Sequence, residues 1–198
     1  MTDIVPIRVA GNAERTSIAA MLARAFAVDP AISFIFPDPA VRARKLPRLF
    51  ALLFDEDAGG MRLVTGGGEA ATLWREPGGA RTSHWDMVRQ ALPMIATFGT
   101  ALARALAVSN AIDQHLPRGD YWYLHIAGCD PSAQGKGFGG AAVRAGLDRV
   151  AGSGLPAYLE TPLERNIGFY RAIGFTVIGD WQVGKDGPRF WSMWREAR

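Results

Sequence analysis

A glycine-rich run at residues 134–140 is the part of the sequence with the most chemical meaning. It reads Gln-Gly-Lys-Gly-Phe-Gly-Gly and lies between an apolar strand and a predicted helix. Glycines let the backbone curl and approach a ligand without interference from Cβ atoms, so that successive N–H groups can point inward as the helix begins. Those first N–H groups lack intrahelical partners and lie at the electropositive end of the helix. The run therefore predicts a site for a diphosphate, with a glycine turn that binds nothing as the alternative.

Spacing separates the phosphate motifs that this run could represent. A P-loop would need a glycine where the chain has Asp130, and Ser or Thr where it has Gly137. The dinucleotide fingerprint fits better, because three glycines match its letters and Glu160 follows at a strand end, where a ribose-binding carboxylate belongs. Against it, the first glycine comes too long after the strand, and too few residues follow Glu160 to complete a doubly wound sheet.

A third motif fits the spacing. It consists of Gln134, Gly137 and Gly139, preceded by a strand and by Asp130 and Pro131. A second group of motif residues follows further along the chain: Asn166, Phe169, Tyr170, Gly174 and Phe175. Together they resemble the acetyl-coenzyme A loop and the following helix of the GNAT acetyltransferase superfamily. Within it, the puromycin N-acetyltransferase-like branch is similar in the segment from Leu155 to Tyr170 and in Trp191, Met193, Trp194 and Arg195.

The resemblance implies acetyl-coenzyme A as the cofactor and direct transfer to an amine within a ternary complex. Backbone N–H groups of the preceding strand would support the pantetheine and the developing oxyanion, and Tyr170 would protonate the departing thiolate. Lys136 either meets a phosphate or faces solvent, and Asn166 either bonds the cofactor arm or lies on a helix surface. The residues assigned to the cofactor are Ala127, Gly128, Cys129, Gln134, Gly135, Lys136, Gly137, Phe138, Gly139, Gly140, Asn166, Phe169 and Tyr170.

Transfer to an amine also needs a base, because an amine near the reference pKa of lysine is almost wholly protonated at neutral pH. Glu160, at a strand end beside the loop, is the first candidate and would act through water, with a structural carboxylate as the alternative. His125 is the second, although a hydrogen-bonded core histidine is the commoner outcome. Cys129 is weak as a nucleophile, because the sequence places no histidine beside it. No metal site is expected, since His84 and His115 have no partner at ligand spacing.

The acceptor is expected to be a primary amine of a small molecule. Its site would come from the first helix and its loop, with Asp29 and Phe34, and from a helical insertion at about 76–120 with Trp85 and Asp86. Aromatic walls with one or two carboxylates suit an amine. Core packing explains each aromatic residue equally well, so the sequence does not identify the acceptor.

Composition sets the wider limits. A chain of 198 residues with 48% hydrophobic content fits one domain over residues 1–198. The 22 Lys and Arg are scattered among 19 Asp and Glu, so nucleic acid is not indicated. One cysteine and the lack of an export signal favour the cytoplasm. Residues 91–108 are apolar but interrupted by Pro93, Gly99 and Arg104, which favours a soluble helix over a membrane span. Tryptophans near the C-terminus would suit a homodimer or a core.

The element order predicts a mixed α/β (α+β) domain. Strands are expected at 4–9, 61–65, 70–74, 121–128, 157–160, 175–183 and 190–195, and helices at 12–27, 41–54 and 137–150. A capping box at Thr161 predicts a further helix, and two helices should meet near Gly99. The resemblance implies a central, mostly antiparallel sheet flanked by helices and splayed at the acetyl-coenzyme A strand.

The predicted function is therefore that of an acetyl-coenzyme A-dependent N-acetyltransferase. A non-catalytic module that binds or senses acyl-coenzyme A is one alternative, and a nicotinamide-dependent oxidoreductase is another.

Overall fold

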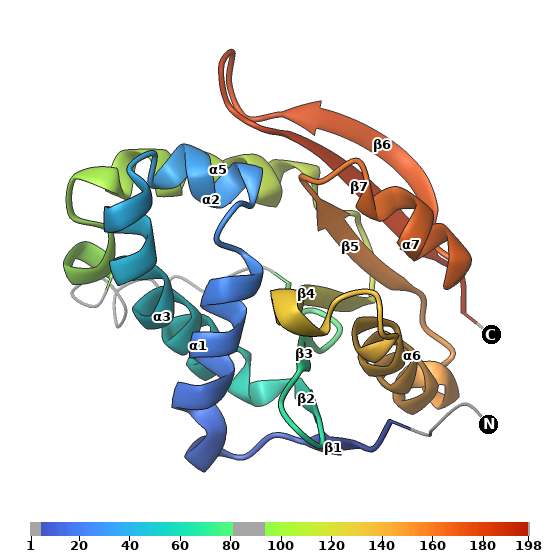
Figure 1. Ribbon diagram of the computed structural model, residues 1–198. Coiled ribbons are helices and arrows are strands. Elements are labelled where there is room, and N and C mark those ends of the chain that lie inside the picture. Colours follow the sequence, from blue (N-terminus) through green and yellow to red (C-terminus); the bar gives the residue numbers. More distant parts are fainter. Residues whose placement is uncertain (1–4, 81–93, 198) are drawn as a thin grey trace.

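A seven-stranded sheet forms the centre of the molecule in the computed structural model, which describes residues 5–80 and 94–197. The strand order is β1-β2-β3-β4-β5-β7-β6, and every neighbouring pair is antiparallel except β4 and β5. The predicted mixed, mostly antiparallel sheet is confirmed (Figure 1). The strands are β1 (Ile7–Val9), β2 (Met61–Thr65), β3 (Ala70–Arg75), β4 (Trp122–Cys129), β5 (Ala157–Thr161), β6 (Thr176–Gln182) and β7 (Arg189–Arg195).

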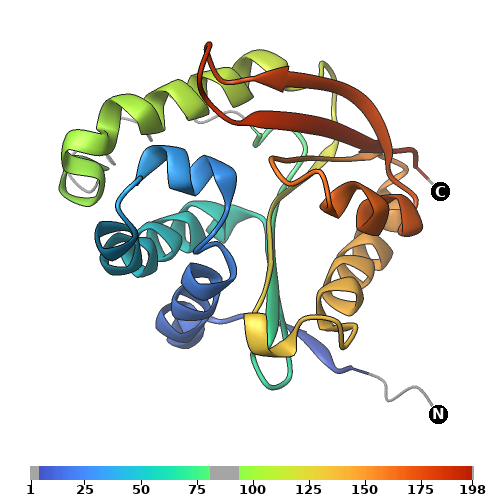
Figure 2. The ribbon, with the colours of Figure 1, turned by 45° about the horizontal axis from the view of Figure 1, so that its top comes forward.

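The sheet opens between its two parallel strands. β4 pairs with β5 only at Trp122 with Ala157 and at Tyr123 with Tyr158, although β4 continues to Cys129. Beyond Tyr123 the strands separate, and β4 pairs with β3 alone. Figure 2 shows β5, β6 and β7 turned away from the half of the sheet that holds β2, β3 and β4. The predicted splay at β4 is therefore present.

β4 also carries a bulge at the start of this opening. Leu73 and Trp74 are neighbours on β3, but their partners are Ile126 and Leu124, so His125 is an extra residue on β4. In a regular strand, residues two apart share a face. Here Leu124 packs in the core beside α6 (Phe138–Val150), whereas Ile126 packs against the core beside α1 (Arg15–Ala25). The bulge thus changes which face the second half of β4 presents.

Helices cover both faces of the sheet (Figures 1 and 2). One face packs against α1 and a group made of α2 (Pro30–Ile35), α3 (Pro39–Glu56) and α5 (Leu102–His115), and the other packs against α6 and α7 (Asn166–Ala172). Two glycines permit close contacts: a Cβ at Gly128 would lie 2.5 Å from Leu22, and one at Gly146 would lie 2.5 Å from Trp74. The sheet is therefore enclosed where the helices lie and open where β4 leaves β5.

The remaining helix predictions have mixed outcomes. The predicted break near Gly99 is confirmed, because a 3-10 turn at Gly99–Ala101 precedes α5. The helix predicted to start at Thr161 begins at Asn166 instead, since Thr161 ends β5 and its Oγ1 accepts a hydrogen bond from Leu163 N at 3.3 Å across a turn. The apolar stretch after Asp29 is a short helix, α2.

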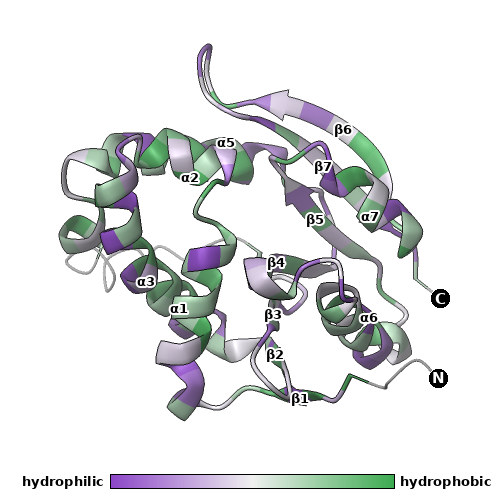
Figure 3. Ribbon diagram, in the orientation of Figure 1, coloured by the Kyte–Doolittle hydropathy of each residue, from purple (hydrophilic) through white to green (hydrophobic). Residues whose placement is uncertain are grey.

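The helical run Met94–His115 is apolar over much of its length (Figure 3). By length and composition it could cross a membrane, and it is the one such helix in the described part of the chain. A single helix of this kind is weak evidence for a span, because core helices of soluble proteins pass the same test.

Candidate active site

The glycine-rich run forms an arc of backbone amides before α6 that donate to no backbone carbonyl among the described residues. Gly135 and Gly137 have φ of 77° and 87°, the left-handed region that favours glycine. Within residues 94–197 and 5–80, no N–H group of residues 135–140 donates to a backbone carbonyl, and the first helical bond runs from Ala141 N to Gly137 O. The Gly139 N–H faces the Sγ of Cys129. These amides fit the predicted role of a diphosphate cradle.

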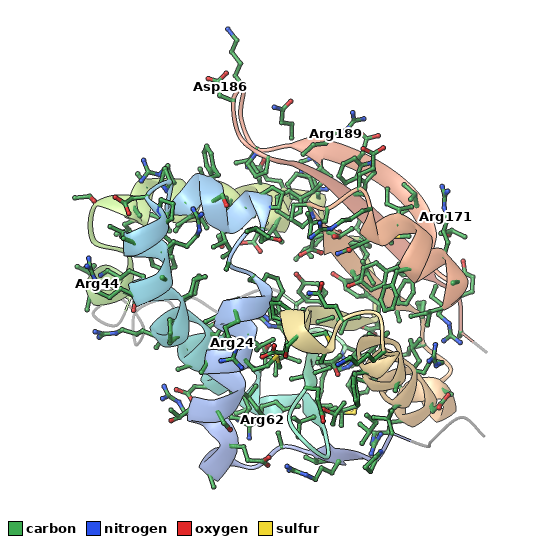
Figure 4. The ribbon with its side chains drawn as sticks, in the orientation of Figure 1. Arg24, Arg44, Arg62, Arg171, Asp186 and Arg189 are labelled. Atoms are coloured by element: carbon green, nitrogen blue, oxygen red, sulfur yellow. The ribbon has the colours of Figure 1, made fainter. Side chains whose placement is uncertain are left out.

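A network around Asp130 fixes the entry to this arc. One carboxylate oxygen accepts hydrogen bonds from Ser132 N at 3.0 Å and Ser132 Oγ at 2.7 Å. The other forms an ion pair with Arg24 of α1 at 2.6 Å (Figure 4). The Ser132 hydrogen bonds and then Arg24 lower the pKa of Asp130 to about 2. Arg24 was not among the predicted site residues, because it lies far from the loop along the chain.

Two polar side chains of the arc bond to the loop itself. Lys136 Nζ donates to Ser132 O at 3.0 Å, and Gln134 Nε2 donates to Cys129 O at 3.3 Å. Gln134 thus ties the loop to the end of β4. A phosphate contact by Lys136 stays a prediction.

Replacing Gly137 by alanine should weaken coenzyme binding. An L-residue in the left-handed region costs roughly 1–2 kcal/mol, so either the strain persists or the amides turn away, and the Kd for coenzyme A should rise about tenfold. Isothermal titration calorimetry measures this. Gly152→Ala is the matched control, because a Cβ there meets no atom within 4 Å and φ is not positive. Equal affinities of Gly137→Ala and the native chain would contradict the cradle.

Tyr170 lies on α7 with its side chain in the core that α6 and α7 share with the sheet. It is 7% exposed and packs edge-on against Phe169 and Phe175, at ring-centroid distances of 5.0 and 5.9 Å. Burial raises the pKa of its phenol well above the usual value, so the hydroxyl keeps its proton. No hydrogen bond to this hydroxyl comes from the residues that the structure describes. Tyr170 is therefore a protonated donor available to a ligand.

Asn166 and Phe169 lie on the same short helix as Tyr170. Asn166 Nδ2 donates to Thr161 Oγ1 at 3.4 Å, which joins α7 to the end of β5. Phe169 is 40% exposed, unusually open for a phenylalanine. Their contacts with the cofactor arm stay predictions, as does the support expected from the N–H groups of residues 127–129.

Glu160 lies on β5 and shares a face with Tyr158. Tyr123 of β4 donates a hydrogen bond from its hydroxyl to Glu160 Oε1. Oε2 is buried and has no hydrogen-bond partner among the described residues. Burial, opposed by the hydrogen bond from Tyr123 and by the charge of Arg75, raises the pKa of Glu160 to about 7. The carboxyl group thus exchanges a proton near neutral pH, as a general base must.

A charged cluster borders this pair. Asp57, at the end of α3, lies 2.6 Å from Arg75 Nε and 2.7 Å from His125 Nδ1, and Glu56 lies 3.2 Å from Arg75. Burial lowers the pKa of His125, so the ring is neutral at pH 7. His125 has the hydrogen-bonded setting that the sequence analysis considered the commoner outcome. Asp57 and Arg75 were missed, because only the fold brings them together.

Replacing Asp57 by alanine should destabilise the fold strongly. It would leave Arg75 buried without its closest counterion, and breaking a buried pair in this way costs about 3–5 kcal/mol. Urea unfolding followed by circular dichroism measures the loss. Asp180→Ala is the control, because its pair with Arg189 is exposed and should contribute only about 0–1 kcal/mol. Losses of similar size in both variants would contradict the structural importance of Asp57.

The residues predicted to bind the acceptor lie in different settings. Asp29 is buried and caps α2, because its Oδ1 accepts from Ala31 N at 2.9 Å and Ile32 N at 3.1 Å. Burial raises the pKa of Asp29 to about 6. Phe34 is partly buried against the core beside α1. Trp85, Asp86 and His84 lie outside the described residues, and contacts of any of these with an acceptor stay predictions.

An aromatic stack joins α5 to the far strands on the side of the sheet that holds Glu160. Trp181 lies between His115 and Phe190, with ring-centroid distances of 4.4 and 4.6 Å. Its Nε1 donates to Ser192 Oγ, which also bonds the Tyr158 hydroxyl, each at 3.0 Å. This stack was not predicted, because its residues come from three separate elements. It fixes β6 and β7 beside Tyr158, which shares a face of β5 with Glu160.

A mixed sheet that opens at one strand, with free amides at the start of the next helix, defines an acetyltransferase fold. Residues 92–175 match the family described as Acetyltransferase (GNAT) family. The match covers that part of the chain, and the fold as a whole is similar to those of GNAT acetyltransferases. The dinucleotide alternative is wrong, because a doubly wound fold needs a mostly parallel sheet.

Several known proteins are similar to this chain. A histone acetyltransferase HPA2 and related acetyltransferase from Corynebacterium glutamicum has a TM-score of 0.74 and 26% identity, over 98% of this chain and 97% of that one. Arylalkylamine N-acetyltransferase 2 from Aedes aegypti has a TM-score of 0.61 and 11% identity, over 98% and 99%. A mycothiol acetyltransferase from a Nocardioides species is 38% identical over 60 residues, which span 29% of this chain and 20% of that protein. The chain thus matches only a fifth of the length of that relative.

Proposed function

We propose that the chain is an acetyl-coenzyme A-dependent N-acetyltransferase that acts on a primary amine of a small molecule. The observation that carries the proposal is the position of three features around one opening of the sheet. The amides of residues 135–140, which bond no backbone carbonyl of the described chain, follow β4, and Glu160 lies on β5 with one carboxylate oxygen that has no partner there. Tyr170, whose hydroxyl is protonated, follows on α7. A diphosphate, a proton acceptor and a proton donor are what acetyl transfer to an amine requires.

Each group has a defined task. The amides of residues 135–140 would bind the diphosphate of the coenzyme, and Phe169 with Asn166 would line its arm. The bound coenzyme supplies the acetyl group as a thioester. Glu160 accepts a proton from the ammonium form of the acceptor at Oε2, directly or through water. Tyr170 donates its phenolic proton to the sulfur that leaves. A cytoplasmic location, a homodimer and a puromycin N-acetyltransferase-like branch stay predictions.

The class of acceptor is supported by the groups that surround Glu160. The buried rings of Tyr123 and Tyr158 lie beside it, and Trp181 joins Tyr158 through Ser192. A further carboxylate, Asp113 of α5, lies near enough to raise the pKa of Glu160. Aromatic faces and negative charge attract a cationic amine. We therefore expect the acceptor to carry an aromatic or apolar group next to its amine.

A thiol-release assay over a panel of amines tests the proposal. The panel contains arylalkylamines, aliphatic amines and amino sugars, and mass spectrometry identifies the acetylated product. Acetyl-coenzyme A alone should stabilise the fold in a thermal-shift experiment, by about 2.7 kcal/mol at 100 times its Kd, and NAD should not. Binding of acetyl-coenzyme A without release of thiol from any amine would instead favour the sensing module. The absence of any shift with acetyl-coenzyme A would contradict both functions.

A further inference from the structure

Arg75 lies on β3 and has no task in the proposed transfer. It is the register partner of Tyr123 on the neighbouring strand, and Tyr123 is in turn the partner of Tyr158 on β5. Directly paired residues share a face, with Cβ atoms about 4.5–5.5 Å apart. Glu160 lies two residues beyond Tyr158 and shares that face as well. Tyr123, which donates to Glu160, thus stands between the carboxyl group and the guanidinium of Arg75.

The guanidinium of Arg75 is held in place by two carboxylates. Its Nε lies 2.6 Å from Asp57, and its terminal nitrogen lies 3.2 Å from Glu56. The Asp57 side chain is fully buried, and that of Arg75 is 14% exposed. Two carboxylates therefore prevent the cation from turning out to solvent, where water and salt would screen its charge.

The ionisable groups around the two side chains can be named from each element. Glu160 interacts with Tyr123 of β4, Tyr158 of β5, Asp113 of α5, Arg75 of β3 and Tyr170 of α7. Arg75 faces Glu56 and Asp57 at the end of α3, and Tyr123 of β4. His125 of β4 is neutral against Asp57. Arg75 is the one cation among the groups that act on Glu160 in the described part of the chain, where it opposes the cost of burial and the charge of Asp113.

We propose that Arg75 is a positioning residue whose fixed positive charge keeps Glu160 able to ionise at neutral pH, so that Glu160 can take the proton of the acceptor amine. The inference rests on the proposed function. In the step concerned, one N–H bond of the ammonium breaks and one O–H bond forms at the carboxylate. The amine becomes neutral with its lone pair free, and the proton leaves to water after the transfer. Without the charge of Arg75, burial and the neighbouring acids would hold Glu160 in the protonated form.

The test compares pH profiles of kcat/KM from pH 5.5 to 9.5. Arg75→Gln keeps donors for Asp57 but removes the charge, Arg75→Lys restores a charge, and Arg62→Gln is the matched control. Arg62 is also partly buried, but it lies on β2 over the ring of Phe54, at 4.1 Å from its centroid. The ionisation of the amine itself is the same for every variant. A difference in the pH profile between two variants therefore comes from the enzyme.

The acid limb of the profile is the fall of kcat/KM toward low pH. In Arg75→Gln this limb should move to higher pH by about one unit, the pKa shift that a single charge causes at an effective dielectric near 20. The loss in kcat/KM should then be roughly tenfold below pH 6.5 and less than about twofold at pH 9.5. Arg75→Lys should return the limb toward its native position, and Arg62→Gln should not move it. A purely structural role for Arg75 would lower activity evenly at every pH.

If the single variant Arg75→Gln does not fold, the double variant Arg75→Gln/Asp57→Asn replaces it. The double variant removes both charges of the buried pair, so neither is left without a counterion. Thermal unfolding shows which variants are native, and the double variant should show the same displaced limb. Suppose that Glu160→Gln is inactive but that the native chain and the Arg75 variants lose activity at the same acidic pH. The role of Arg75 would then be overturned, and the proposed function would stand. If Glu160→Gln keeps native activity, the base of the proposed function is overturned, and the role of Arg75 falls with it.

Discussion

Replacing Glu160 by glutamine is expected to lower kcat/KM for the amine by about 10²- to 10⁴-fold, the range that removal of a general base produces. Glutamine has nearly the shape of glutamate, and its oxygen still accepts the hydrogen bond from Tyr123. It lacks the oxygen that is buried without a partner and can take a proton. Initial rates of thiol release at pH 8 measure the effect.

The pH profile separates this role from a change in binding. The pKa of Glu160 is about 7, so native kcat/KM should rise with pH through that value as the active carboxylate forms. The limb should be absent in Glu160→Gln. Glu164→Gln is the control, because Glu164 is exposed on the turn before α7. Native activity in Glu160→Gln would show that another group takes the proton.

Stability provides an internal check on the same variant. The native pKa of Glu160 lies above the usual value, so the folded chain holds this proton more tightly than the unfolded chain. Its contribution to stability is therefore present at low pH and is lost as the pH rises through about 7. Glutamine, which stays neutral, should make the fold no less stable at pH 8. A loss of activity with an intact melting transition then reports on chemistry.

Replacing Tyr170 by phenylalanine should lower kcat by about 10²- to 10⁴-fold, because the thiolate must then leave without a proton donor. The ring and its contacts with Phe169 and Phe175 remain. The Kd for acetyl-coenzyme A should change little, since the diphosphate is bound at residues 135–140. Single-turnover kinetics and calorimetry measure the two quantities separately.

Tyr121→Phe is the matched control for this second substitution. Tyr121 is also buried, but it packs with Tyr123 and Tyr158 at the start of β4, away from α7. Its variant should keep kcat near the native value. Unchanged turnover in Tyr170→Phe would remove the phenol from the mechanism, and a matching rise in Kd would assign it to binding.

Local rules were enough for most elements. Two short apolar runs separated by Gly66, Gly67 and Gly68 predicted β2 with its bounds, and β3 within one residue of its end. The order of strand, glycine run and helix at β4 and α6 was also correct, because turns, glycine conformation and helix starts depend on neighbours in sequence. The start of α7 was wrong, because Thr161 bonds as the last residue of a strand rather than as a helix cap. The paired strand competed with the local signal and prevailed.

The glycine arc, Tyr170 and the candidate base Glu160 could be predicted from the sequence, since each is marked by residue type and by position within one element. The partners that surround them follow from the three-dimensional fold: Arg24 beside Asp130, Asp57 beside Arg75 and His125, and Tyr123 on Glu160. These partners come from different elements far apart in the chain. Their meeting depends on strand order, register and the bulge at His125, which arise from packing of the whole sheet rather than from any local pattern.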